Sequence, residues 1–338
     1  MRRDFYTFNF DTQAWEQATP MPLGQELQYA VGVSFNNLGY VFGGINQTNF
    51  LSDLWEFDPA SQLWVSKPSL PSAGRSGASG FIINQKLYIV GGKNNDTEAL
   101  NEVWTNDFNS ASWTQKANLP FEGRWRASTV TINEKVYLLF GIYENGRYHN
   151  EIYQYFPDDD EWSLTGFFPE AGRNYADVKV INEQIYSVGG MDSLGTFHND
   201  LWRYNPELNT WLQLISLPAA GRRGSMSFTD GQSFYFSSGL NESLQRINET
   251  WKADQITFAY SAETQKPFHF YPNPAHQFIV IEHEKTDIST LEIFDSKGRL
   301  CHQQNVIKGQ NTILIDWLSP GVYFIRLNNG GFHKLLKL

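Results

Sequence analysis

The side chains best suited to chemistry in this chain are one arginine and a few aromatic residues, at places where an internal pattern varies. Trp125 stands beside Arg126, while Tyr29 and Tyr175 occupy places matching Arg126 elsewhere in the chain. A guanidinium can clamp a carboxylate or a phosphate, and aromatic rings can stack on a sugar. These four residues are therefore the candidate ligand-binding residues. Ordinary packing at the rim of a pocket is the alternative for all of them.

Groupings that would support a metal site are weak. His149 and His198 are 49 residues apart, but the corresponding places elsewhere hold Leu100 and Ile247, which favours packing under a loop. The acidic run at 158–161 is typical of a solvated hairpin rather than a calcium loop. We predict no metal ligand, no cofactor and no catalytic residue.

Composition excludes several classes of partner. The formal net charge is −10, which argues against a nucleic-acid partner. No stretch of about 18 apolar residues occurs, so no transmembrane segment is predicted. Cys301 is the single cysteine, so no intramolecular disulfide can form. Basic residues at the N-terminus precede no apolar segment, so no signal peptide is visible.

An internal repeat of about 49 residues must position the candidate side chains. One tryptophan recurs at this spacing: Trp15, Trp64, Trp113, Trp162 and Trp211. A glycine recurs at 48 or 49 residues: Gly44, Gly92, Gly141, Gly190 and Gly239. Each of these glycines has a tyrosine four residues before it. Because three series agree across the chain, the repeat is the unit of the fold.

Each repeat reads as four short strands. In one unit, an inner strand over 77–83 leads through a turn to a second strand over 87–90, which stops at Gly91-Gly92. A third strand is expected around Trp104 and a fourth around Trp113. Four strands in a repeat of this length are typical of a β-propeller blade.

The repeat resembles the Kelch family, whose hallmarks are a Tyr-x-x-Gly-Gly element and a tryptophan near the end of each unit. The element occurs at 40–44, 88–92 and 186–190. Two repeats depart from it, with Phe140-Gly141 and Ser238-Gly239, and Tyr260 stands where the last tryptophan is expected. The resemblance implies an all-β Kelch-type propeller over residues 1–260. It does not specify a ligand.

The repeats form five full blades and one half blade. Residues 4–15 match only the third and fourth strands of a unit. A propeller must close to remove its sheet edges. Either the ring is six-bladed and its first blade lacks inner strands because the N-terminus is truncated, or a native ring closes around the half blade. We favour the truncated six-bladed ring.

Residues that recur in every blade are expected to hold the scaffold together. An arginine follows a glycine before each inner strand, at Arg75, Arg124, Arg173 and Arg222. An acid begins each third strand, at Asp4, Asp53, Glu102, Glu151, Asp200 and Glu249. We expect ion pairs or hydrogen bonds between loops rather than a functional arginine ring.

Residues 261–267 read as a linker, and residues 268–338 differ in pattern from the repeats. About seven short strands are expected there, including 278–281 and 291–295, in a small Ig-like antiparallel β-sandwich. The Tyr-Pro-Asn-Pro start at 271–274, the hairpin around 293–298 and the Leu-x-x-Gly-x-Tyr element at 318–323 resemble the type A sorting domain of the type IX secretion system of Bacteroidota. The resemblance implies an address read by the type IX secretion machinery. An ordinary Ig-like accessory module is the alternative.

These observations predict a secreted or cell-surface, non-catalytic protein that binds an extracellular glycan or protein through the propeller loops. One alternative is a sugar enzyme similar to sialic-acid mutarotases, using Glu98 or Glu144 with Arg126 as acid/base groups. The other is an intracellular Kelch adaptor that grips acidic peptides, against which the sorting domain argues. Copper chemistry of the galactose-oxidase kind is excluded, because residues 1–260 contain no cysteine.

Overall fold

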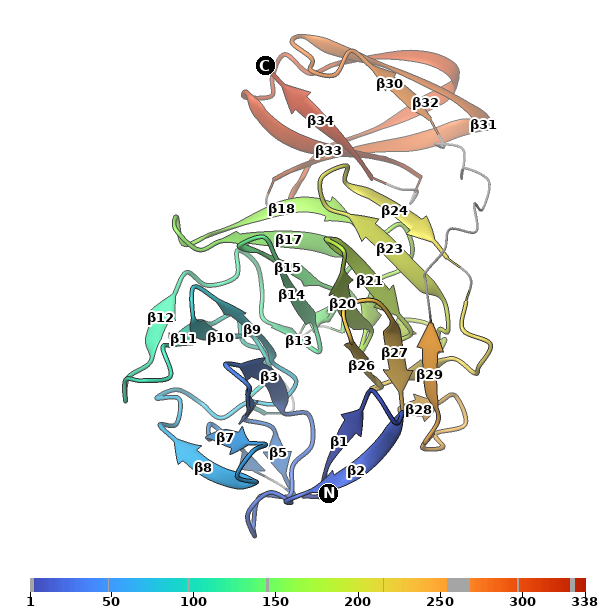
Figure 1. Ribbon diagram of the computed structural model, residues 1–338. Helices are drawn as coiled ribbons and strands as arrows, with labels where there is room; N and C mark the ends of the chain where they lie inside the picture. Colours follow the sequence, from blue (N-terminus) through green and yellow to red (C-terminus); the bar gives the residue numbers. More distant parts are fainter. Residues whose placement is uncertain are drawn as a thin grey trace.

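The computed structural model describes residues 3–47, 49–95, 98–143, 146–214, 216–253, 268–296, 298–328 and 332–338, and these residues are all-β. Antiparallel sheets stand around a ring, and a separate C-terminal sheet lies beside it (Figure 1). The described residues contain no helix long and apolar enough to cross a membrane.

Four sheets have four strands each, as the repeat predicts. The first comprises β3 (Val31–Phe35), β4 (Leu38–Phe42), β7 (Leu54–Asp58) and β8 (Leu63–Lys67). The second comprises β9 (Ser79–Ile83), β10 (Lys86–Val90), β11 (Val103–Asn106) and β12 (Thr114–Lys116). The third comprises β14 (Ser128–Ile132), β15 (Lys135–Leu139), β17 (Glu151–Phe156) and β18 (Glu161–Phe167). The fourth comprises β20 (Asp177–Ile181), β21 (Gln184–Val188), β23 (Leu201–Asn205) and β24 (Thr210–Gln213).

A three-stranded sheet and an N-terminal hairpin complete the ring. The sheet contains β26 (Met226–Thr229), β27 (Phe234–Ser237) and β29 (Thr250–Ala253), and the fourth strand expected around Tyr260 lies outside the described residues. The hairpin joins β1 (Phe5–Asn9) to β2 (Ala14–Ala18). The ring centroid of Phe8 lies 5.0 Å from that of Phe228 in the fifth blade. The ring centroid of Phe5 lies 4.9 Å from that of Phe57 in the first blade. The hairpin therefore occupies the place of a blade between them.

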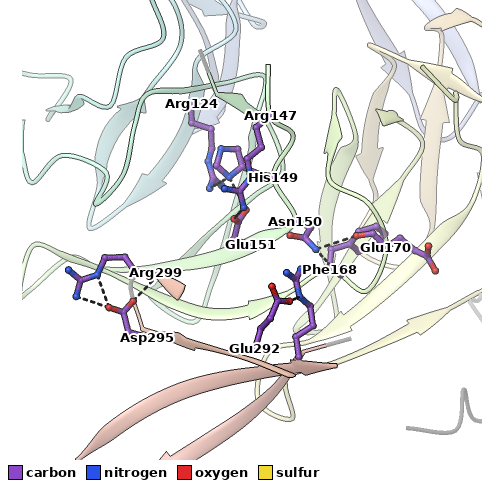
Figure 2. Close-up of polar contacts among 11 residues, drawn as sticks. Arg124, Arg147, His149, Asn150, Glu151, Phe168, Glu170, Glu292, Asp295 and Arg299 are labelled. Atoms are coloured by element: carbon purple, nitrogen blue, oxygen red, sulfur yellow. Dashed lines mark hydrogen bonds and ion pairs between the residues drawn. The ribbon is translucent and has the colours of Figure 1, made fainter. Parts of the chain in front are cut away.

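The side chains of the buried arginines tie together loops of their own blade, as the repeat comparison predicts. Each is at most 1% exposed. Three pair directly with the acid at the start of a third strand, and the ion pairs are Arg75–Glu102 at 2.6 Å, Arg173–Asp200 at 2.6 Å and Arg222–Glu249 at 3.0 Å. In the third blade, His149 lies between Arg124 and Glu151 (Figure 2). Burial and the charge of Arg124 lower the pKa of His149 to about 3, so its imidazole is neutral.

The glycine pairs allow the backbones of adjacent blades to approach closely. The second glycine donates its N–H to an arginine carbonyl of the next blade, for example Gly92 to Arg124 at 2.9 Å. A Cβ on Gly91 would lie 2.2 Å from the Arg124 carbonyl oxygen, so a larger residue at this joint would require the backbone to shift. Short strand pairs follow at this end of the ring: β5 (Ile45–Asn46) with β6 (Asn49–Phe50), β13 (Arg124–Trp125) with β16 (Ile142–Tyr143), β19 (Arg173–Asn174) with β22 (Met191–Asp192), and β25 (Arg222–Arg223) with β28 (Leu240–Asn241).

The C-terminal sheet has five strands where about seven were expected. These are β30 (His269–Tyr271), β31 (Phe278–Asp295), β32 (Leu300–Leu314), β33 (Gly321–Leu327) and β34 (Phe332–Lys337). The segments 278–281 and 291–295, predicted as separate strands, are the two ends of β31. The register shifts between His283 and Ile288, so one strand continues through the bend and the sheet curls around its own core.

Candidate functional site

One residue of each full blade turns inward just before the inner strand, and all five adopt the left-handed conformation. The φ angles are 58° at Tyr29, 60° at Gly77, 56° at Arg126, 52° at Tyr175 and 61° at Gly224. Glycine adopts this conformation readily, whereas other residues are strained by it. Three large side chains are nevertheless held there, and strain of this kind is concentrated at functional sites.

Backbone hydrogen bonds link these positions around the ring. The Gly77 N–H donates to the Tyr29 carbonyl at 2.8 Å, and the Arg126 N–H donates to the Gly77 carbonyl at 2.7 Å. The Tyr175 N–H is 3.5 Å from the Arg126 carbonyl oxygen. The inward corners of four blades are therefore neighbours, although they are 48 or 49 residues apart in the chain.

The four side chains predicted from the sequence meet at one end of the ring's central channel. The guanidinium carbon of Arg126 lies 3.7 Å from the ring centroid of Trp125, 4.2 Å from that of Tyr175 and 5.6 Å from that of Tyr29. The rings of Tyr29 and Tyr175 are 5.8 Å apart. We call Tyr29, Trp125, Arg126 and Tyr175 the central cluster. Its planar groups provide both stacking faces and a positive charge.

Two atoms of the central cluster are buried without a hydrogen-bond partner, the Arg126 Nε and the Tyr175 Oη. Burial lowers the pKa of Arg126, because desolvation penalises its charge, and the pKa of Tyr175 is raised for the same reason. Buried polar groups in folded proteins are normally paired, and an unpaired one costs stability. A hydrogen bond made to either atom by a bound molecule would remove that cost.

Two further cations flank the central cluster that the sequence comparison did not single out. The Arg223 guanidinium lies 5.5 Å from the Tyr175 ring, and the Lys93 ammonium lies 4.4 Å from the Trp125 ring. Within the described parts of the chain, neither Arg126 nor Arg223 forms an ion pair with a carboxylate. Arg126 and Arg223 therefore place two guanidinium groups at this end of the channel, in a chain whose net charge is −10.

Comparison of the repeats could have identified Arg223 as a residue near the central cluster. Arg223 follows Arg222 as Trp125 follows Arg124, so the two occupy equivalent places. Asn174 is the corresponding residue of the fourth blade, and it donates to the Tyr148 hydroxyl at 3.1 Å. Lys93 could not have been identified in this way, because it follows a glycine pair in a loop whose length and sequence vary between blades.

A cavity of about 540 Å³ is lined by residues of several inner strands and also by Phe57 and Trp64, which lie on the third and fourth strands of the first blade. Small and hydroxylated side chains line much of it, including Gly32, Ser34, Thr129 and Thr131. Phe5 of the hairpin lies at its edge. The volume is of the size that small-molecule sites occupy, but the four residues of the central cluster are not among those that line it.

The residues considered for acid/base catalysis are not at the central cluster as far as the structure describes them. Glu98 is exposed, and its carboxylate accepts a hydrogen bond from Asn95 at 3.3 Å. Glu144 lies outside the described residues. The described residues contain no group of three potential metal ligands; His149 is buried against Glu151, and His198 contacts Asp192.

Comparison with protein families identifies both parts of the chain. Residues 1–173 match the KLHDC2/KLHL20/DRC7 Kelch-repeats domain, and residues 172–217 match the Kelch motif. Residues 269–338 match the secretion system C-terminal sorting domain. No curated protein shows significant similarity to the chain. The Kelch repeats and the sorting segment expected from the sequence are confirmed, and the sorting segment indicates handling by type IX secretion.

Proposed function

Because this chain belongs to the KLHDC2/KLHL20/DRC7 Kelch-repeats domain family and ends in a secretion sorting domain, we propose that it is a non-catalytic binding protein that acts outside the cell or at its surface. The division into a propeller over 1–260, a linker over 261–267 and a sorting domain over 268–338 is part of this proposal. So is a Bacteroidota source, which the sorting resemblance implies.

The ligand proposed is an extracellular glycan that carries a carboxylate. The observation that supports it is Arg126, held between the rings of Trp125 and Tyr175 with a buried Nε that has no partner. A guanidinium binds a carboxylate in a bidentate manner, and flat aromatic rings pack against the apolar face of a sugar. A second cation, Arg223, favours an anionic over a neutral sugar.

A glycan array probed with the full chain tests this function. Uronic- or sialic-acid glycans should bind, and the same glycans with the carboxylate reduced should bind at least about tenfold more weakly, since a charge-assisted hydrogen bond contributes about 1.5–3 kcal/mol. Arg126→Gln should abolish binding, while Arg126→Lys should retain part of it because the charge remains but the planar stacking is lost.

Arg299→Gln is the matched control, because Arg299 is exposed in the turn between β31 and β32 and its substitution removes the same charge. Binding that survives Arg126→Gln, or that ignores the carboxylate, would contradict the proposal. Retention of a protein ligand instead, with no glycan bound, would assign the site to protein recognition.

A further inference from the structure

The third blade differs from the other blades on its outermost strand. Leu164 and Phe167 of β18 are 3% and 7% exposed. The equivalent places in the first, second and fourth blades are polar: Ser66, Gln115 and Gln213 correspond to Leu164, and Ser69, Asn118 and Ser216 to Phe167. All six polar residues are exposed or partly exposed. Of these four blades, only the third therefore carries apolar residues at both places.

The C-terminal sheet covers these two side chains. Figure 1 shows this sheet next to β18. The Phe167 ring lies 5.6 Å from Phe324 of β33 and 6.2 Å from Phe294 of β31, and all these residues share one apolar cluster. The Leu164 N–H donates to the Ser296 carbonyl at 2.7 Å. The apolar change in the repeat thus coincides with the place where another sheet packs.

The C-terminal sheet is apolar on the side that meets the blade. Along β33, Ile325 and Leu327 belong to the sheet's own core, whereas Val322 and Phe324 alternate to the opposite face and pack on the third blade. On the same strand, Arg326 pairs with Glu292 of β31 at 2.7 Å. A sheet with one solvated face would carry polar residues at those positions.

The turn after β31 is also shaped for the contact. Gly298 has φ of 77°, and a Cβ on it would lie 2.9 Å from the Tyr153 hydroxyl of β17. Tyr153 stands where other blades carry Trp104, Trp202 and Trp251, whose indole N–H groups bond to the blade's own acid. The third blade therefore departs from the pattern of the other blades where the turn of the C-terminal sheet contacts it.

We infer that the third blade is a docking site built for the chain's own sorting domain, so that propeller and sorting domain form one rigid body. Domains joined by a linker are expected to move independently unless a large apolar interface holds them. Here an apolar interface replaces residues that are solvated in sister blades. The outer face of the sorting sheet is consequently covered until it undocks, and undocking uncovers Leu164 and Phe167.

Small-angle X-ray scattering of the full chain tests the docking. The wild type should scatter as a single compact particle, with a radius of gyration near the about 20 Å expected of a compact chain of this length. The double variant Leu164→Gln/Phe167→Ser should give a larger radius and a broad distribution of dimensions. These substitutions introduce residues found in the sister blades, so the propeller should keep its fold.

Val322→Ser weakens the same contact from the side of the C-terminal sheet. It should also increase the radius of gyration. Val65→Ser is the matched control, because Val65 is an apolar residue exposed on the outermost strand of the first blade. Circular dichroism checks that each variant is folded. A wild type that already scatters as two independent bodies overturns the inference, and so does a folded double variant that scatters like the wild type.

Discussion

At the residue scale, Asp177 shows how one substitution changes a repeated contact. In the second and third blades a serine hydroxyl bridges to the next blade, Ser79 to the Ala127 carbonyl at 2.8 Å and Ser128 to the Ala176 carbonyl at 2.7 Å. Asp177 is the equivalent residue of the fourth blade, and its Oδ2 is buried without a partner. A carboxyl group must be protonated to donate a hydrogen bond to a backbone carbonyl, as those serine hydroxyls do. Burial raises the pKa of Asp177 from 3.8 to about 7, although the charge of Lys179 and hydrogen bonding by Ser225 and Ser227 oppose the shift.

The stability of the protein should therefore fall as the pH rises through the range between these two values. Between about pH 4 and pH 7 the folded state retains a proton on Asp177 that the unfolded chain has released, so rising pH favours unfolding. Asp177→Asn is neutral at every pH and should remove this slope. In urea denaturation, the free energy of unfolding of Asp177→Asn should exceed that of the wild type by more at pH 8 than at pH 4. A gain that is the same at both pH values would contradict the assignment.

At the element scale, each blade joint depends on a glycine just before the buried arginine. A Cβ on Gly123 would lie 1.9 Å from the Ala99 carbonyl oxygen, and one on Gly74 would lie 2.1 Å from that of Phe50. Gly172 and Gly221 meet the neighbouring loop in the same way. The obstacle is backbone in every case, so a side-chain rearrangement cannot relieve it. The strands form from local alternation, but the joints between blades require these glycines.

Gly123→Ala should consequently destabilise the protein by about 3 kcal/mol or more, the upper end of the cost of overpacking. Gly32→Ala is the control, because Gly32 lies on an inner strand with nothing within 4 Å of its added Cβ. That control should leave the free energy of unfolding unchanged or slightly raised. Urea denaturation of both variants measures the difference. Equal stabilities for the two would show that the joint can relax.

At the scale of the whole molecule, the N-terminal hairpin joins the first and fifth blades. Phe8 contacts both Phe228 and Tyr235 on one side, while Phe5 contacts Phe57 and Trp64 on the other. A ring without this hairpin would expose the faces of both neighbouring blades. Repeat structures gain stability from each interface between neighbours, so these two seams affect the cooperativity of the entire ring.

Phe8→Ala should lower the free energy of unfolding by about 2 kcal/mol, since a partly buried aromatic cluster is lost. It should also broaden the thermal transition in calorimetry, because the ring can then open at one seam. Tyr6→Ala is the comparison, since Tyr6 lies on the same strand and is 48% exposed. If Tyr6→Ala is as damaging as Phe8→Ala, the seam does not control closure.

The repeat, the four-stranded blades and the residues of the candidate site could all be predicted from periodicity in the sequence. Periodicity reveals these features because equivalent positions of each blade make the same packing contacts and therefore carry the same residue types. Departures from the period were equally informative, and they led to Tyr29, Arg126 and Tyr175. The neighbouring Arg223 could have been found in the same way.

Which of the residues that depart from the repeat contact one another is visible only in the tertiary structure. Lys93 reaches the central cluster from a variable loop, and Leu164 and Phe167 meet a sheet whose contacting residues lie more than 120 residues further along the chain. The continuity of β31 through its bend was likewise invisible, because alternation along a strand does not reveal where that strand curls. Contacts between distant segments depend on how the ring closes and on what packs against it. The local periodicity of the sequence predicts neither.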